Sequence, residues 1–270
     1  MAAAKKIYTL SFIGAGKMAT AIASGLGADR TLRIKAFDVS AAAAEAFAAR
    51  TGRPASSTLA DALEGADAVL LAVKPQFAAE ALDAAAPLLK GKLLISIVAG
   101  WPLALLEKHA KTGRIVRVMP NTPALAGEGM SCFAPAEAVG EADITRVEAI
   151  LASVGKVRRV SEKLLDAVTG LSGSGPAFVM EFIMGLADGG VFCGLPRDAA
   201  LELAVQTVLG TAVMCRENPK AIAELRDAVI SPAGTTACGI LALQENAFKA
   251  TAAKAVIAAA ERSAELGKGK

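Results

Sequence analysis

Five short apolar runs of strand length alternate with segments of helical composition in the first 120 residues. The runs are rich in Ile, Val and Leu and cover residues 7–13, 32–37, 68–73, 93–98 and 115–119. Strands that are buried on both faces of a parallel sheet show continuous apolar runs of this kind. The segments between them, at 18–26, 41–50, 77–89 and 103–111, have the Ala, Leu, Glu and Lys content of helices. The alternation predicts a doubly wound α/β domain around a parallel sheet.

The second part of the chain has a different pattern. After about residue 160, apolar residues recur at spacings of three and four over residues 177–192, 197–216, 220–229 and 235–262. The sequence therefore predicts two domains, a sheet domain at 1–160 and an all-α domain at 161–270. Because the segment 177–191 is too apolar for the surface of a small monomeric bundle, we expect subunits to associate through the second domain.

The small number of histidines and the spacing of the cysteines exclude several kinds of metal and redox site. The chain has one histidine, His109, so it cannot form a metal site with several histidine ligands, and any imidazole proton relay must use this residue. The four cysteines are far apart and form no C-x-x-C pair, which excludes a zinc knuckle and a dithiol redox motif. We expect no metal, and cysteines that act as small apolar residues in a reducing compartment.

Charge and targeting signals favour a soluble cytoplasmic protein. The formal charge of +3, from 29 basic and 26 acidic side chains, is too even to indicate a nucleic-acid or membrane partner. Residues 1–6 lead directly into the first apolar run, without the apolar region and cleavage site of a signal peptide. We expect no membrane span, because Glu181 and Asp188 interrupt the long apolar run after Gly173.

A glycine-rich segment follows the first apolar run. Gly14 permits a tight turn, Gly16 lets a pyrophosphate approach the backbone, and Ala19 replaces a third glycine where the helix packs on the strand. The phosphates would then bind free N–H groups at the start of the helix. The position between the first strand and the first helix favours dinucleotide binding over a purely structural turn.

The end of the second run bears on the choice of coenzyme. Asp38 stands where a carboxylate would accept hydrogen bonds from the adenosine ribose and favour NAD. Ser40 would instead contact a 2′-phosphate, or cap the next helix. No arginine is adjacent to Asp38, so the preference between NADPH and NADH stays open.

Two further segments follow apolar runs, at the sheet edge where ligands bind in open α/β folds. Lys74, in the segment 72–75, is suited to a phosphate or ribose oxygen, with a solvated loop lysine as the alternative. Asn121 lies in Met-Pro-Asn-Thr-Pro, where two prolines stiffen a loop that presents an amide and a hydroxyl. A ligand role is favoured there over a rigid turn because of the position at the sheet edge.

The helical half contains a second candidate receptor, the segment Ser-Pro-Ala-Gly-Thr-Thr at 231–236. It opens a helix, and exposed N–H groups and hydroxyls there are suited to a carboxylate. Simple helix capping needs one side chain, whereas this segment offers three hydroxyls and a glycine.

Together these segments resemble the Δ1-pyrroline-5-carboxylate reductase family over nearly the full length of the chain. The resemblance rests on FIGAGKMATAI, AVKPQ, VRVMPNTPA, DAVTGLSGSGPAFV, LADGGVFCGLPRDAA and LRDAVISPAGTT, in that order. It implies a Rossmann-type domain, a helical dimerisation domain, and a homodimer that often assembles into a decamer. It also implies reduction of 1-pyrroline-5-carboxylate to L-proline by NADPH or NADH.

The resemblance assigns roles to matching positions. The coenzyme would be bound by Ile13, Gly14, Ala15, Gly16, Lys17 and Met18, by Ala72, Val73, Lys74 and Pro75, and by Asn121. The substrate would be held by Ser231, Gly234, Thr235 and Thr236, with Thr236 as the catalytic residue hydrogen-bonded to the ring nitrogen. The chain departs from the family in three places. Ala233 replaces the first glycine of SPGGTT, Ala228 stands near a position that is often polar, and Asp38 lies where relatives carry Asn or Arg.

An iminium suits this chain because it is already protonated and electrophilic, so positioning and one hydrogen-bond partner suffice. Reduction of a ketone would require a proton donor. A β-hydroxyacid dehydrogenase would carry a lysine early in the first long helix, but none occurs between Lys163 and Lys220. A lactate-type dehydrogenase requires a catalytic histidine, and we expect His109 on a solvated helix end. A nucleotide sensor without catalysis would need no second receptor.

Overall fold

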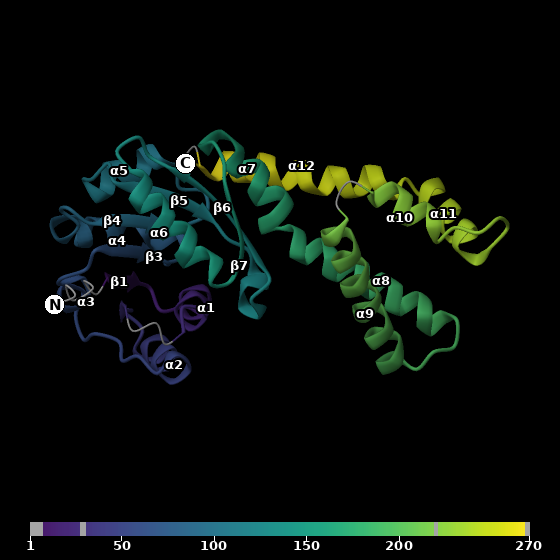
Figure 1. Cartoon of the computed structure of the whole chain (residues 1–270), viewed down its shortest axis with the longest axis horizontal. Coiled ribbons are helices and arrows are strands. Elements are labelled where there is room, and N and C mark those ends of the chain that lie inside the picture. The colour runs from purple at the N-terminus through teal and green to yellow at the C-terminus, as the bar shows by residue number, and fades with distance from the viewer. Residues whose placement is uncertain (1–7, 28–30, 219–220, 268–270) are drawn as a thin grey trace, which may run out of the picture. The chain divides into compact units, whose positions relative to one another are not determined.

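The computed structural model describes residues 8–27, 31–218 and 221–267, and this part of the chain divides into two compact units (Figure 1). Unit 1 spans Met1–Gly173 and includes the segment Ala259–Lys270, and unit 2 spans Ser174–Ala258. The last helix therefore contributes residues to both units. Ile7 and Lys220, where two predicted elements begin, lie outside the described residues.

Unit 1 is built around a sheet of seven described strands in the order β2-β1-β3-β4-β5-β6-β7. The strands from β2 through β5 are parallel, β6 is antiparallel to β5, and β7 is parallel to β6. The five predicted runs are confirmed as strands. The bounds are β1 Tyr8–Ile13, β2 Leu32–Phe37, β3 Ala68–Leu71, β4 Leu93–Ser96, β5 Ile115–Met119, β6 Gly129–Pro135 and β7 Gly155–Arg159.

Side chains of successive strand residues enter two separate cores, one on each face of the sheet. Phe12 packs in a cluster with residues of α1, α2 and α6, whereas Ile13 packs with residues of α3, α4 and α5. The sheet is therefore covered on both sides, which confirms the doubly wound fold. The helices are α1 Lys17–Gly25, α2 Ala41–Thr51, α3 Leu59–Leu63, α4 Ala78–Ala85, α5 Leu103–Ala110, α6 Glu141–Ala152 and α7 Leu165–Val168.

The C-terminal end of α12 is anchored to unit 1 by a polar cluster beside β5. Arg117 is 7% exposed, and its guanidinium lies 3.2 Å from Glu162 Oε1 and 3.8 Å from Asp166 Oδ1. Ser263 of α12 donates a hydrogen bond of 2.7 Å to the same Asp166 carboxylate. Because a buried arginine requires charged partners, this cluster couples the last helix to the sheet.

Every regular element that the structure describes in unit 2 is a helix, as predicted. Its helices are α8 Gly175–Phe192, α9 Arg197–Glu217, α10 Ile222–Ala228, α11 Thr235–Glu245 and the first part of α12 Phe248–Gly267. The prediction of one helix over 235–262 is wrong, because the chain turns at Ala247, whose φ is +52°. Alanine carries no sequence signal for a left-handed residue, so the break was not visible in the composition.

Much of the apolar surface of unit 2 is exposed. Only small side chains, Ala187, Ala200 and Ala204, form its buried cluster between α8 and α9. Large exposed side chains include Met180, Met184, Phe192, Leu203 and Leu209. By length and composition alone, the stretches Glu162–Phe192 and Arg197–Glu217 are long and apolar enough to cross a membrane, although Glu181 and Asp188 interrupt the first of them. A subunit interface exposes the same kind of surface in a single protomer.

Candidate functional site

The turn after β1 requires glycine at its first position. Gly14 has φ +95°, and a Cβ added to it would lie 2.7 Å from the carbonyl oxygen of Ala72. Any larger residue would therefore be strained in its backbone and would collide with the chain that leaves β3. The ends of β1 and β3 meet here, which places the glycine loop and the segment 72–75 at the same edge of the sheet.

The start of α1 presents free backbone to solvent. Gly16 is the N-cap, no side chain caps the helix, and the first turn contains no acidic residue. A Cβ added at Gly16 would find no atom within 4 Å, so the space above the backbone is open. The first N–H groups of α1, including those of Lys17 and Met18, have no carbonyl partner one turn earlier in the helix. Open space and unpaired N–H groups together suit a phosphate.

Asp38 holds the glycine loop in place. One carboxylate oxygen accepts a hydrogen bond of 2.7 Å from the N–H of Ala15, and the other accepts one of 2.8 Å from the N–H of Ser40. Each oxygen can accept a further bond, so contact with a ribose stays compatible with this geometry. The Ser40 hydroxyl accepts from the N–H of Ala43 at 3.3 Å, so the structure contains the helix cap that was one of the two alternatives for this residue.

The remaining predicted coenzyme residues lie at the carboxyl ends of β3 and β5. Lys74 is exposed just before the short turn Pro75–Phe77, and its side chain forms no hydrogen bond or ion pair within the described residues. The Asn121 side chain is occupied within the protein. Its oxygen accepts from the N–H of Met130 at 2.8 Å, and its amide nitrogen donates to the hydroxyl of Ser172 at 3.2 Å. Asn121 thus fixes the loop, and a ligand would contact its backbone or its remaining amide hydrogen.

Ser172 belongs to a short π-helical segment, Thr169–Gly173, that leads into α8. Such segments are rare and occur frequently at functional sites. The segment lies in the motif DAVTGLSGSGPAFV, one of those on which the family resemblance rests. Through Asn121, the loop after β5 is tied to the chain that leads into the helical half.

One cavity beside the glycine loop shows a residue that the sequence analysis missed. It has a volume of about 780 Å³ and is lined by Gly16 and Lys17 together with residues of α2, including Arg50. Ala43, Ala46 and Arg50 line the same cavity at spacings of three and four, which places them on one face of α2. This spacing was readable in the sequence, and it adds a cation to the surroundings of the loop.

The candidate substrate loop in unit 2 is a tight turn. The N–H of Gly234 donates to the carbonyl of Ser231 at 3.0 Å, and a Cβ at Gly234 would lie 2.0 Å from the Ser231 hydroxyl oxygen, so a larger residue would require the Ser231 side chain to move. Ala233, which replaces a family glycine, has φ +52°. An L-residue with a Cβ is strained in this region, which explains why glycine suits the position.

Helix α11 begins directly after this turn without a side-chain cap. Its N-cap is Gly234, and its first turn contains no acidic residue. In the part of the chain that the structure describes, the hydroxyls of Ser231, Thr235 and Thr236 form no hydrogen bond, and Thr236 is partly buried. The capping alternative therefore does not account for these hydroxyls. They and the first N–H groups of α11 are available to a carboxylate.

His109 lies in the last turn of α5, as expected, but its side chain is less solvated than the sequence suggested. Its side chain is 19% exposed, its Nδ1 lies 2.8 Å from Asp83 Oδ1, and its ring centroid is 5.4 Å from that of Trp101. It joins α4 to α5 as a structural residue.

The other candidate metal-binding and redox residues in the described part of the chain also give no site. Burial raises the pKa of the Cys132 thiol, which keeps it protonated. Within the described residues, no three His, Cys, Asp or Glu side chains are grouped to hold a metal ion.

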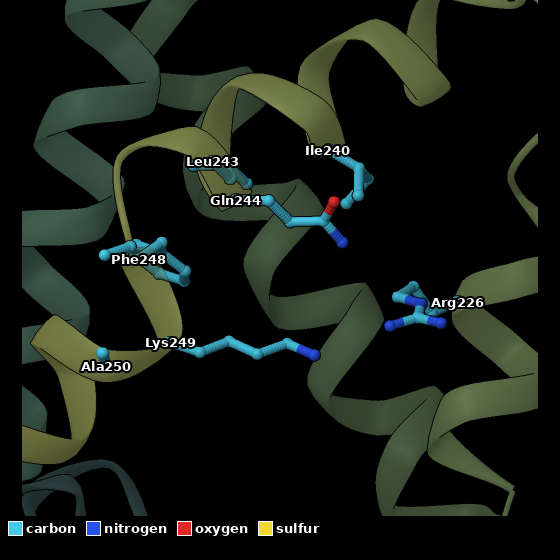
Figure 2. Close-up of a pocket in the computed structure, with 8 residues that line it drawn as sticks. Arg226, Ile240, Leu243, Gln244, Phe248, Lys249 and Ala250 are labelled. Carbon is cyan, nitrogen blue, oxygen red and sulfur yellow. The ribbon is translucent and has the colours of Figure 1, made fainter.

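A second cavity of about 460 Å³ lies in unit 2 between α10, α11 and the start of α12. Figure 2 shows the side chains of Arg226, Gln244 and Lys249 directed toward the same space, with Ile240 beside Gln244. Its lining contains none of the residues 231–236. The cavity is thus separate from the candidate substrate loop, and its apolar lining continues the exposed apolar surface of unit 2.

Both halves of the chain match known protein families. Residues 9–100 match a family model described as NADP oxidoreductase coenzyme F420-dependent. Residues 162–266 match one described as pyrroline-5-carboxylate reductase dimerisation. The two matches divide the chain into a coenzyme-binding part and a helical part, in agreement with the fold.

Relatives cover nearly the full length. The chain is 44% identical over 266 residues to a pyrroline-5-carboxylate reductase of Glycine max, with 96% of each chain covered. It is 43% identical over 264 residues to a protein of the same name from Methanosarcina acetivorans, with 96% of this chain and 98% of the relative covered. The crystal structure of Plasmodium falciparum pyrroline carboxylate reductase with NADP bound superposes with a TM-score of 0.86 at 34% identity, covering 97% of this chain and 99% of that chain.

Proposed function

The chain belongs to the pyrroline-5-carboxylate reductase family, and from this premise we propose that it reduces the imine carbon of 1-pyrroline-5-carboxylate with NAD(P)H. The product is L-proline, and the reaction is the last step of proline biosynthesis. The observation that carries the proposal is the group of unbonded hydroxyls at the uncapped start of α11, in a chain that also has an open glycine loop. This second receptor is what a coenzyme sensor without catalysis would lack.

The coenzyme, when bound, supplies the hydride. The residues Ile13, Gly14, Ala15, Gly16, Lys17 and Met18 hold its pyrophosphate at the start of α1, where the backbone is open. Ala72, Val73, Lys74 and Pro75 contact the ribose and nicotinamide side, and the loop at Asn121 lines the nicotinamide pocket. Asp38 and Ser40 meet the adenosine end, where Asp38 also fixes the loop through Ala15.

Residues 231–236 hold the substrate. The hydroxyls of Ser231 and Thr235 and the first N–H groups of α11 bind the carboxylate, and Gly234 lets it approach the backbone. The hydroxyl of Thr236 accepts a hydrogen bond from the protonated ring nitrogen. Because the iminium already carries its proton, the chain needs no histidine or carboxylic acid at the reacting carbon. Thr236 therefore orients the imine, and positioning supplies most of the catalysis.

We further propose that residues 1–160 form the coenzyme domain and 161–270 the dimerisation and substrate domain of a cytoplasmic homodimer. The dimerisation-family match over 162–266 and the exposed apolar side chains of α8 and α9 support association through the helical part. Five such dimers would form the decamer that the family resemblance implies. Sedimentation of the purified protein distinguishes a protomer pair from the larger assembly, and a stable monomer would contradict the proposal.

The activity is tested by mixing the purified protein, 1-pyrroline-5-carboxylate and either NADPH or NADH, and by following nicotinamide absorbance. Titration of both coenzymes in the same assay measures their preference. Oxidation of neither coenzyme by a well-folded oligomer would disprove the reductase function. As the runner-up, a β-hydroxyacid dehydrogenase would instead reduce NAD(P)+ with a hydroxyacid and leave the imine untouched.

A substitution at Thr236 tests whether residues 231–236 bind the substrate. Thr236→Ala should lower kcat at least about tenfold, because a hydrogen bond to a charged group is lost, while coenzyme affinity stays within about twofold. The matched control is Thr251→Ala, a threonine of α12 outside the loop, which should leave both values unchanged. If the Thr236 variant lost coenzyme binding instead, residues 231–236 would be a coenzyme site and our assignment of this loop to the substrate would be wrong.

A further inference from the structure

A polar cavity of about 350 Å³ lies in unit 1 at the edge of the sheet where β1 and β5 begin. Four basic side chains line it, those of Lys90, Lys92, Arg114 and Arg146. Strand β1 begins here and ends at the glycine loop, so the cavity is separated from the coenzyme residues by the length of that strand, roughly 17 Å. The reductase activity gives this cavity no role.

Most of the local negative charge is already neutralised. Arg114 donates from Nε and Nη2 to the two oxygens of Asp143 at 2.7 and 2.8 Å, and from Nη1 to the carbonyl of Gly91 at 2.8 Å. Asp67, the other acidic residue of the lining, accepts from the N–H of Thr9 at 2.9 Å. The Arg114–Asp143 pair therefore forms a neutral part of the wall.

The remaining lining has a positive charge. Lys90, Lys92 and Arg146 face the single carboxylate of Asp67. Within the described residues the side chains of the two lysines form neither an ion pair nor a hydrogen bond; Lys90 is exposed and Lys92 is partly exposed. Cations that converge on a polar cavity without enough local carboxylates are suited to an anion.

Tyr8 gives an independent indication of a missing acceptor. Its phenol oxygen is buried and has no hydrogen-bond partner among the described residues, although most buried polar atoms in proteins are paired. The guanidinium carbon of Arg146 lies 4.3 Å from its ring centroid. Burial raises the pKa of Tyr8 to about 12, so the phenol stays protonated at neutral pH and keeps its hydrogen as a donor.

We propose that this cavity binds a small phosphate-class anion, through Lys90, Lys92 and Arg146 with the Tyr8 hydroxyl as a neutral donor. The anion is inorganic phosphate or a small phosphomonoester, since both present oxygens of the same charge and geometry. Because the coenzyme loop lies at the opposite end of β1, the anion and the coenzyme bind to the same protomer at the same time.

The test is calorimetric titration of the full chain, saturated with NADPH, with inorganic phosphate and separately with glycerol 3-phosphate. Potassium chloride keeps the ionic strength constant. Saturation with NADPH occupies the coenzyme loop, so any remaining phosphate site lies elsewhere. We expect saturable binding with one site per protomer, and the tighter of the two probes identifies the source of the phosphate group.

Substitutions of the lining residues test whether the phosphate binds in this cavity. The double variant Lys90→Gln and Lys92→Gln should weaken binding at least about tenfold, whereas Lys156→Gln, an exposed lysine of β7, should not change it. Tyr8→Phe should weaken binding about threefold or more. Because Tyr8 is the single tyrosine of the chain, binding should also produce a tyrosine difference spectrum that this variant lacks. The proposal is overturned by absence of saturable binding to the NADPH-saturated chain, or by equal affinity of the double variant and Lys156→Gln.

Discussion

The left-handed alanines allow a test of the substrate loop that separates stability from function. Ala233 and Ala247 both have φ +52°, and both are exposed, but only Ala233 lies in the turn 231–236. Replacement of each by glycine removes the same strain at two places. The stability effect should therefore be shared by both variants, and any effect on substrate binding should belong to Ala233→Gly alone.

The expected magnitude follows from two opposing terms. A left-handed conformation costs an L-residue about 1–2 kcal/mol, which glycine avoids. Glycine also lowers the free energy of unfolding by roughly 0.4–1 kcal/mol, because the unfolded chain gains conformational freedom. Each variant should thus be more stable by about 0.5–1 kcal/mol, and the two gains should add in the double variant because the sites share no partner.

The measurement is chemical denaturation at a fixed protomer concentration, since association would otherwise change the apparent stability. KM for 1-pyrroline-5-carboxylate is measured on the same preparations. We expect Ala233→Gly to lower KM by up to about threefold, because loss of the Cβ lets the carboxylate approach the turn more closely. Destabilisation by both substitutions would refute the strain argument, and an equal change of KM in Ala247→Gly would refute the assignment of the loop.

Three further outcomes follow from single contacts. Gly14→Ala should abolish coenzyme binding and destabilise the protein by more than about 2 kcal/mol, whereas Gly16→Ala, with open space around it, should fold normally and bind coenzyme more weakly in a fluorescence titration. Arg117→Met should lower the free energy of unfolding by about 2–4 kcal/mol in urea, because two carboxylates lose a buried partner. Folding raises the pKa of Tyr8 from 10 to about 12, so the unfolded chain loses this proton at lower pH than the folded chain. The free energy of unfolding should therefore fall between pH 10 and about pH 12, and it should fall less in Tyr8→Phe than in the parent. An equal fall in both proteins would contradict this prediction.

The central strands were predictable because both of their faces are buried. Strand β3, for example, is buried along its whole length, so its sequence is a continuous apolar run. Strand β7 lies at the sheet edge and carries Lys156, Arg158 and Arg159, so it lacks that pattern. Strand β6 reverses direction beside β5 and contains Ser and Cys. The sequence therefore indicates the buried centre of the sheet and not its far edge.

Contacts between distant segments were less accessible to sequence reasoning. The role of Asp38 as an acceptor for the N–H of Ala15 depends on the adjacent ends of β1 and β2, which residue spacing alone does not reveal. The same holds for Asn121, whose partners Met130 and Ser172 belong to other elements. In both cases the residue type and its position at the sheet edge were predictable, but the partners depended on tertiary structure.

Serine and threonine residues that precede a helix have different roles that the sequence alone does not distinguish. The same residue types precede α2, α3 and α11, yet Ser40 and Thr58 cap their helices and the hydroxyls near α11 do not. Helices α1 and α11 both begin at glycine, without a cap and without an acid in the first turn. An uncapped helix start leaves unpaired N–H groups, which is unfavourable unless water or a ligand binds them. Helices α5 and α8 also begin without a side-chain cap or an acid in the first turn, so the missing cap alone does not mark a ligand site. At α1 and α11 the family motifs add the assignment to phosphate and carboxylate, and these ligands would bind the unpaired N–H groups.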